Sequence, residues 1–390
     1  AKADVNATDN HQYGMISLAA QKGKMAVLEA LIDAKAEVNV RSKNGAHALW
    51  EAVNQGHVNV VKMLLAAKAD LHDTGNLLEV ATRRGCLETM QVLIDAGADV
   101  NQRGLYGMTA LMAAVSHRNR FAVNLLITAK ADVTLVDDNG NGCLRYAAKR
   151  GQTAVIRAIL DAKAHVDQRF QHDGTALSDA VYNGHLEAVN ILLAAKADVS
   201  IKNDDGNSLL ILAAKLDHVE IADVLIKAGA DINQRGWLGG TALAMAAFHC
   251  QFAVTNLLLA AKADVHIVDD LSNTALSSAA FKGSVPILEA LIEAGANINQ
   301  RHQGGETALT MAVWQGHIDA VNVLIAAKAE ISILDDNGNG PLQRAATKGH
   351  TAVLRALIAA GAEINQHHWC GETALAAAAY HSNLDALLIL

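Results

Sequence analysis

Histidine and cysteine side chains with metal-binding chemistry gather near the C-terminal end of the sequence. His367, His368 and Cys370 lie in one short run, and His381 follows later. Zinc is held by such nitrogen and sulfur ligands, usually four in a tetrahedron. The run would have to fold back onto the following segment to bring His381 into the set, so we expect no metal site and no cofactor.

The sequence shows no arrangement typical of catalysis. No glycine-rich phosphate loop follows a strand pattern, no Ser-His-Asp set converges, and no carboxylate pair has a reason to be desolvated. The four cysteines lie far apart without a CxxC spacing, which is typical of reduced thiols in the cytoplasm. They are Cys86, Cys143, Cys250 and Cys370. We therefore expect a cytoplasmic protein that is not an enzyme.

Composition narrows the classes of function further. The 390 residues are 51% hydrophobic and carry a net charge of −8. That apolar fraction argues against disorder. The most apolar window, Thr241 to Ala261, is interrupted by His249 and Gln251, so we expect no insertion into a membrane. The acidic charge argues against nucleic acid as a ligand, because such binding depends on neutralising phosphates.

The sequence contains an internal repeat, and the elements of this repeat must position any functional side chain. The segment Ala-(Lys/Gly)-Ala-acid-(Val/Ile) recurs about twelve times between Ala1 and Ala360, at steps of 33 residues, except that Ala67 to Ala96 spans 29. Between these marks, Thr-Ala-Leu opens one apolar stretch and a Gly-His turn separates it from a second, as at Thr175 and Gly184. Both stretches have helical spacing. Each repeat is therefore predicted to be a helix pair plus a loop, buried only by stacking on its neighbours.

This pattern resembles the ankyrin repeat family over essentially the whole sequence. The resemblance implies an all-α solenoid of stacked antiparallel helix pairs with projecting β-hairpin fingers at Asp-x-x-Gly turns, and a concave surface of first helices and fingers that binds protein partners. The family's Thr-Pro-Leu-His is Thr-Ala-Leu here, with proline kept only at Pro341. The stop after the second helix is often lysine instead of glycine, where a positive φ would cost about 1 kcal/mol. These lysines are Lys2, Lys35, Lys68, Lys130, Lys163, Lys196, Lys262 and Lys328.

We interpret residues 1–390 as a single array of about twelve repeats. One finger, at residues 71–76, is shortened, and the helix stack is expected to continue past it. The sequence starts without methionine and stops inside a predicted second helix at Leu390, so we expect both ends to be truncated pieces of a longer protein.

A longer period of two repeats runs along the array. Asn-Gln-Arg or a near copy recurs every 66 residues, at Asn101, Asp167, Asn233, Asn299 and Asn365. Fingers with acidic tips alternate with the fingers that carry Asn-Gln-Arg. We therefore expect arginines and aspartates of adjacent fingers to form ion pairs, each of which stabilises the fold by about 0–1 kcal/mol. The arginines are Arg41, Arg103, Arg169, Arg235 and Arg301. Duplication alone or a functional constraint would explain this period.

Aromatic side chains fall mostly in fingers and first helices, outside the predicted core. Even repeats carry aromatic rings near the end of the first helix, where rings are typical of binding hot spots. Odd repeats carry basic groups at the same place. These basic groups either bind acidic side chains of a partner or are only solvated. We expect Tyr106, Trp237, Trp314 and Trp369 to be exposed, and Tyr146 and Phe170 to pack between fingers. The predicted partner-binding residues are Trp50, Tyr106, Lys149, Arg150, Tyr182, Trp237, Phe248, Lys282, Trp314, Trp369 and Tyr380.

The leading hypothesis is a non-catalytic protein–protein interaction scaffold that grips a partner protein or peptide segment in its concave groove. One alternative is the substrate-recruiting segment of a larger enzyme or effector. Another is an architectural subunit of a large assembly.

Overall fold

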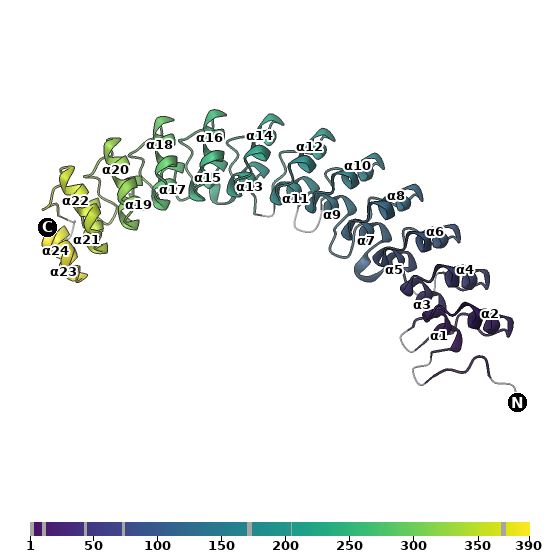
Figure 1. Cartoon of the computed structure of the whole chain (residues 1–390). Coiled ribbons are helices and arrows are strands. Elements are labelled where there is room, and N and C mark those ends of the chain that lie inside the picture. The colour runs from purple at the N-terminus through teal and green to yellow at the C-terminus, as the bar shows by residue number, and fades with distance from the viewer. Residues whose placement is uncertain are drawn as a thin grey trace. The chain divides into compact units, whose positions relative to one another are not determined.

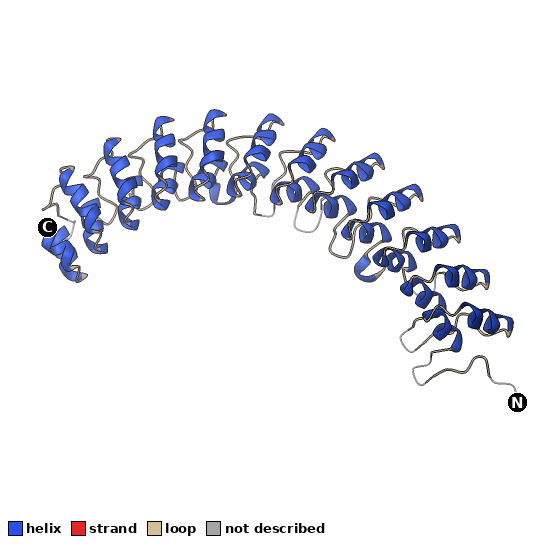
Figure 2. Ribbon diagram, in the orientation of Figure 1, coloured by secondary structure: helices blue, strands red, loops and turns tan. Residues whose placement is uncertain are grey.

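A computed structural model describes residues 4–9, 13–42, 45–71, 75–169, 174–203, 205–367 and 372–390. The chain comprises two compact units, residues 1–197 (unit 1) and 198–390 (unit 2). Each unit consists of consecutive helix pairs joined by loops (Figures 1 and 2).

Unit 1 contains six helix pairs and one short 3-10 helix within the described residues. They are α1 (Met15–Gln21), α2 (Met25–Asp33), α3 (Ala48–Gln55), α4 (Val58–Ala66), α5 (Leu77–Arg84), α6 (Leu87–Asp95), η1 (Leu105–Gly107), α7 (Ala110–Ser116), α8 (Arg120–Thr128), α9 (Cys143–Lys149), α10 (Thr153–Asp161), α11 (Ala176–Tyr182) and α12 (Leu186–Ala194).

Unit 2 has the same organisation in the part of it that is described. Its helices are α13 (Leu209–Lys215), α14 (Val219–Lys227), η2 (Trp237–Gly239), α15 (Ala242–Phe248), α16 (Phe252–Ala260), α17 (Ala275–Lys282), α18 (Val285–Glu293), α19 (Ala308–Gln315), α20 (Ile318–Ala326), α21 (Pro341–Lys348), α22 (Thr351–Ala359), α23 (Ala374–Tyr380) and α24 (Leu384–Ile389).

Two layers of helices form within each unit (Figure 1). The odd-numbered first helices pack on one another, as α17 does on α19, and the even-numbered second helices form the other layer, as α18 does on α20. Leu177 in unit 1, and Leu210 and Leu243 in unit 2, are buried between these layers. The expected all-α repeat solenoid is confirmed.

Local side-chain chemistry sets where the first helices begin and end. The hydroxyls of Thr109 and Thr241 accept the N–H groups of Met112 and Ala244 in the first turns of α7 and α15, and each bond satisfies a donor that lacks a partner inside the helix. Thr307 and Thr310 cap each other reciprocally at α19. Gly316 then ends α19 with φ 77°, a left-handed conformation that glycine adopts without a Cβ clash.

Lysine occupies the same left-handed conformation after the second helices. The φ angles lie between 60° and 70°, as predicted, at Lys35, Lys68, Lys130, Lys163, Lys196, Lys262 and Lys328. Lys2 lies outside the described residues. Each of these lysines carries the Cβ strain that Gly97 or Gly229 avoids at the equivalent position.

The described parts of the fingers are loops without paired strands (Figure 2), and three of them are closed by an isolated β-bridge. In one of them, Val136 bridges Gly142, and the backbone N–H of Asp137 donates to the Asn141 carbonyl at 3.0 Å. The Asp137 carboxylate accepts the N–H groups of Asn139 and Asn141. The carboxylate therefore satisfies two backbone amides of the turn and holds the loop closed.

The first-helix layer continues past the shortened finger of the sequence. Asn76 accepts from the N–H of Glu79 to start α5, and α5 packs against both α3 and α7. Residues 72–74 of that finger lie outside the described part of the chain.

Candidate protein-binding groove

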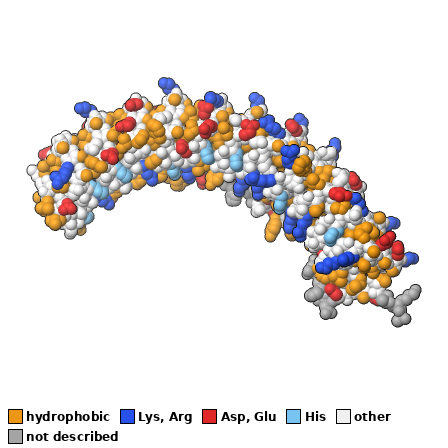
Figure 3. Space-filling model, viewed as in Figure 1, with side chains coloured by type: hydrophobic (Ala, Val, Ile, Leu, Met, Phe, Trp, Pro, Cys, Tyr) orange, Lys and Arg blue, Asp and Glu red, His pale blue; other side chains and the backbone are white. Residues whose placement is uncertain are grey.

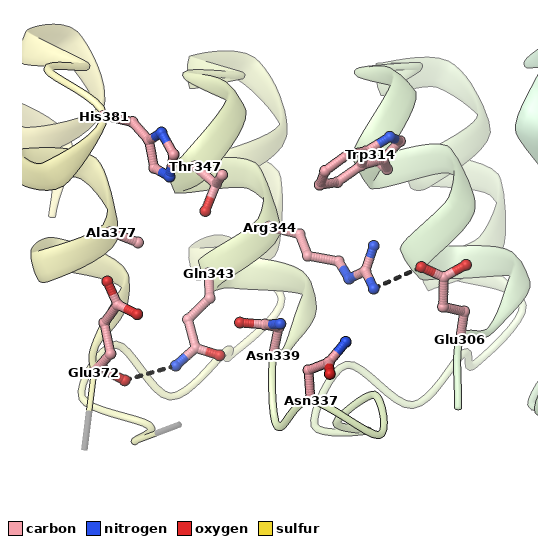
Figure 4. Close-up of a pocket in the computed structure, with 10 residues that line it drawn as sticks. All are labelled: Glu306, Trp314, Asn337, Asn339, Gln343, Arg344, Thr347, Glu372, Ala377 and His381. Carbon is pink, nitrogen blue, oxygen red and sulfur yellow. Dashed lines mark hydrogen bonds and ion pairs between the residues drawn. The ribbon is translucent and has the colours of Figure 1, made fainter. Parts of the chain in front are cut away.

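Unit 2 has a pocket of about 560 Å³ between first helices and fingers (Figure 4). Trp314 on α19, Arg344 and Thr347 on α21, and His381 at the end of α23 form one side. Four finger residues form the other side: Glu306, Asn337, Asn339 and Glu372. The pocket therefore offers one large ring surrounded by hydrogen-bonding groups.

Cationic groups hold the Trp314 ring in place. The Lys348 Nζ atom lies 3.8 Å from the ring centroid, and the Arg344 Cζ atom lies 5.3 Å away. Cations are attracted to the negative face of an aromatic ring. The Trp314 side chain remains 38% exposed, so the ring is both fixed and accessible.

Two carboxylates fix Arg344 in turn. Its Nη2 atom lies 2.6 Å from Glu306 of one finger and also contacts Asp335, whose side chain is fully buried. Burial alone would raise the pKa of Asp335, but hydrogen bonds from the Asn339 backbone and from Arg344 outweigh it and lower that pKa. Arg344 is thus paired with a buried carboxylate that is ionised at neutral pH.

A second group of rings lies near the ends of α15 and α17. The Phe248 and Phe281 rings stack with centroids 6.4 Å apart, and Lys282 Nζ lies 4.3 Å from the Phe248 centroid. The predicted residues Phe248 and Lys282 are therefore in direct contact.

Unit 1 has its own pocket of about 580 Å³, which includes Trp50, Arg84, Leu105 and His117. Arg83, a basic group of an odd repeat, has an acidic neighbour in its own helix. Its Nη1 atom lies 3.2 Å from Glu79, because residues four apart on a helix lie side by side. Arg84 instead donates two hydrogen bonds to the Asn54 side chain.

The finger tips carry the exposed rings that the sequence predicts. Tyr106 is 79% exposed and Trp237 is 62% exposed. Tyr106 and Leu238 adopt φ angles of 57° and 50°, so non-glycine residues form both left-handed tips. Their carbonyls accept the N–H groups of Asp138 and Asp270 in the next fingers.

Arginine–aspartate pairs join neighbouring fingers, as expected. The distances are 3.1 Å for Arg103–Asp138, 2.9 Å for Arg235–Asp270 and 3.2 Å for Arg301–Asp336. The asparagine that precedes each arginine also accepts a backbone N–H from the following repeat, as Asn299 does from Glu330 at 2.9 Å. These contacts give the two-repeat period a structural role.

Four of the predicted binding residues that the structure describes, Lys149, Arg150, Tyr182 and Tyr380, line neither of these two pockets. Lys149 and Tyr182 are exposed, and the Arg150 guanidinium lies 5.8 Å from the half-buried Tyr146 ring. Tyr380, 81% exposed, lies beside His381 with ring centroids 5.1 Å apart. Trp369 and Phe170 lie outside the described residues.

Three residues of the unit 2 pocket were not predicted from the sequence: Glu306, Gln343 and Arg344. Gln343 donates to the Gln366 and Glu372 carbonyls and so ties α21 to the last finger. The spacing of Gln343, Arg344, Thr347 and Lys348 on one helical face is the signal that could have identified them.

The turn histidines are structural. Nε2 of His57, His185, His317 and His350 lies 3.1–3.3 Å from a carbonyl of the preceding repeat. Within the described ranges, no three His, Cys, Asp or Glu side chains are grouped as metal ligands. His368 and Cys370 of the run considered above are outside those ranges. Among the helices described, none has the length and apolar character needed to cross a membrane.

One family model matches the chain along most of its length. The model described as "Ankyrin repeats (3 copies)" matches six overlapping segments: residues 16–104, 78–170, 111–203, 177–269, 243–335 and 319–390.

Curated relatives match over shorter stretches. The chain is 32% identical to potassium channel AKT2/3 of Arabidopsis thaliana over 32% of its own length and 16% of that protein. It is 31% identical to an L-asparaginase of Dirofilaria immitis over 29% of the chain and 25% of the enzyme. A putative ankyrin repeat protein of fowlpox virus, FPV244, is 30% identical over 29% of the chain and 17% of that protein. The chain thus spans a quarter or less of these relatives.

Proposed function

Because the chain belongs to the ankyrin repeat family, whose repeats form protein–protein interaction modules, we propose that it is a non-catalytic scaffold that binds a partner. The partner is a protein, bound through an extended segment in the groove between the odd-numbered helices and the fingers. The proposal places the protein in the cytoplasm and gives it no nucleic-acid ligand.

The observation that carries this proposal is the Trp314 ring. Binding hot spots are enriched in Trp, Tyr and Arg, and a side chain already fixed in place loses less entropy on binding. Trp314 is held by Lys348 and Arg344 at the side of a pocket, yet more than a third of its surface is accessible. A partner side chain that enters this pocket would meet a preorganised apolar surface.

The distribution of the other exposed rings supports the same surface. Tyr106 and Trp237 lie on finger tips, and Phe248 and Tyr380 lie at the ends of first helices. In the even-numbered layer, the described large exposed rings are Phe121 and Phe252. This asymmetry favours binding on the side of the odd-numbered helices and fingers.

One observation favours the alternative that this chain is the substrate-recruiting segment of a larger enzyme. A relative is named an L-asparaginase, and the chain matches a quarter of that enzyme. The same groove would then recruit a substrate for a catalytic part encoded next to it. Determining the coding sequence on either side of this chain would distinguish the two functions, because only the second requires an adjoining catalytic domain.

The proposal is tested by selecting phage-displayed peptides on the protein and measuring their affinities for two variants. The groove variant carries Trp314→Ala and Phe248→Ala. The control carries Phe121→Ala and Phe252→Ala, which removes two exposed rings from the even-numbered layer. We expect losses of about 2 kcal/mol or more for the groove variant only. Peptides that lose affinity equally for both variants, or a selection without any groove-dependent peptide, would refute the proposed function.

A further inference from the structure

Lys282 and His249 lie against the stacked rings of unit 2. Lys282 ends α17, and its Nζ atom lies 4.3 Å from the Phe248 centroid and 5.6 Å from the Phe281 centroid. The His249 ring packs edge-on against Phe248 at 5.4 Å. Lys282, His249 and Phe248 are all exposed, so this cluster faces solvent.

Lys215 ends α13, the first helix that precedes α15 in the stack. Its carbonyl accepts a hydrogen bond from Gln251, which follows closely after His249, so the ends of α13 and α15 are tied together. Burial, and then the charges of Lys215 and Lys282, lower the pKa of His249. Two cations on the flanking helices therefore act on one imidazole between them.

Some basic groups of unit 2 have acidic partners, unlike these two lysines. Lys227 contacts Asp223 at 2.6 Å, and Arg344 contacts Glu306 at the same distance. Within the described residues, Lys215 and Lys282 form no salt bridge, and the Lys282 ammonium lies over two ring faces. Figure 3 shows basic and histidine side chains recurring along the edge of unit 2 that the odd-numbered helices form.

We infer that Lys215, His249 and Lys282, together with the Phe248 ring, form a docking site for a glutamate or aspartate side chain of the partner segment. This inference rests on the proposed function and specifies the chemistry of the partner. A carboxylate placed between the two lysines would accept hydrogen bonds from their ammonium groups and relieve their mutual repulsion. The methylene groups of a glutamate would cover the exposed face of Phe248.

A bound carboxylate would also change the protonation of His249. The negative charge offsets the two lysines, so the pKa of His249 must rise when the acidic segment binds. By linkage, the affinity for that segment must increase as the pH falls through the titration range of His249.

The first test uses fluorescein-labelled hexaglutamate as the probe and hexaglutamine as the neutral comparison. Replacing both lysines, Lys215→Gln and Lys282→Gln, should weaken hexaglutamate binding about tenfold, because each exposed ion pair contributes up to about 1 kcal/mol. The control, Lys227→Gln with Lys262→Gln, removes two charges from the side of the even-numbered helices and should change binding less than about twofold. Equal losses in the two proteins, or binding of hexaglutamine, would overturn the inference.

The second test follows the His249 ring proton of the wild-type protein by NMR. The pKa of His249 should rise on addition of hexaglutamate, and an unchanged pKa would contradict the site. A phosphoserine peptide that binds where hexaglutamate does not would replace the carboxylate assignment by a phosphate one. If groove-dependent peptides are selected but hexaglutamate fails both tests, the proposed function stands and this inference falls.

Discussion

Lys348 places its ammonium nitrogen 3.8 Å from the centre of the Trp314 ring, one repeat earlier in the chain. Phe248 and Lys282 have the same relationship at 4.3 Å. The rings of even repeats and the lysines of odd repeats, which the sequence places in separate rows, therefore pair across neighbouring first helices.

The first prediction is an energetic coupling between Trp314 and Lys348. In a double-mutant cycle of Trp314→Leu and Lys348→Met, urea unfolding should give a coupling of about 0.5–1 kcal/mol, the usual range for an exposed cation–π pair. Trp314→Leu with Lys282→Met is the control, because Lys282 contacts Phe248 instead, and this pair should show no coupling. Equal coupling in both cycles would mean that the ring contact itself contributes nothing.

The second prediction concerns backbone strain. Lys262 has a φ of 67° after α16, where glycine would avoid the Cβ clash. Lys262→Gly should raise the free energy of unfolding by about 0.5–1 kcal/mol, whereas Lys262→Ala keeps the Cβ atom and should give no gain. Denaturant titration of both variants measures the difference. A gain for alanine as large as that for glycine would point to the lost charge as the cause.

The third prediction is a pH dependence from His302. This side chain is buried between two fingers; its Nδ1–H donates to the Ser272 carbonyl at 2.6 Å, and its Nε2 atom has no partner among the described residues. Burial lowers the pKa of His302 below 6.5, although Glu306 and Asp269 act in the opposite direction. The stabilisation is therefore present above pH 6.5 and is lost as the pH falls through the lowered pKa.

Hydrogen exchange at the Gln303 amide, which donates to the Leu271 carbonyl of the preceding finger, reports this effect locally. Protection should decrease as the pH falls below 6.5, after correction for intrinsic exchange, and His302→Asn should remove most of that dependence. The same pH profile in the variant would show that another group is responsible.

The fourth prediction concerns the shortened finger at residues 71–76. Finger contacts supply part of the coupling between neighbouring repeats. Amides of α1–α4 should therefore open at a lower free energy than those of α7–α10, as a separate cooperative block. Uniform protection from α1 to α10 would mean that helix interfaces alone carry the coupling.

The sequence predicts the fold well because helix pairs and their stops are local. The apolar spacing and the threonine caps define α15 and α19, and the recurring lysine positions mark the left-handed stops that the structure contains. Pairing of Arg301 with Asp336 is also predictable, since both positions recur with the two-repeat period.

The site is less predictable because it depends on contacts between repeats. Trp237 on a finger tip is exposed as expected, since no neighbouring core position can receive its ring. The contacts of Lys348 and Arg344 with the Trp314 ring depend on how α21 packs on α19. Composition and spacing do not determine that packing. Burial of Asp335 and its pairing with Arg344 likewise appear only once the finger is folded against the helix.

The central claim, that a partner lies between the odd-numbered helices and the fingers, is tested most directly by mapping where a bound peptide touches the protein. A peptide from the selection is synthesised with a photo-reactive phenylalanine analogue, irradiated in the complex, and the attachment sites are identified by mass spectrometry. We expect attachment at the ends of α15, α17, α19 and α21 and on the adjacent fingers. Attachment concentrated on α14, α16, α18 and α20 would contradict the account.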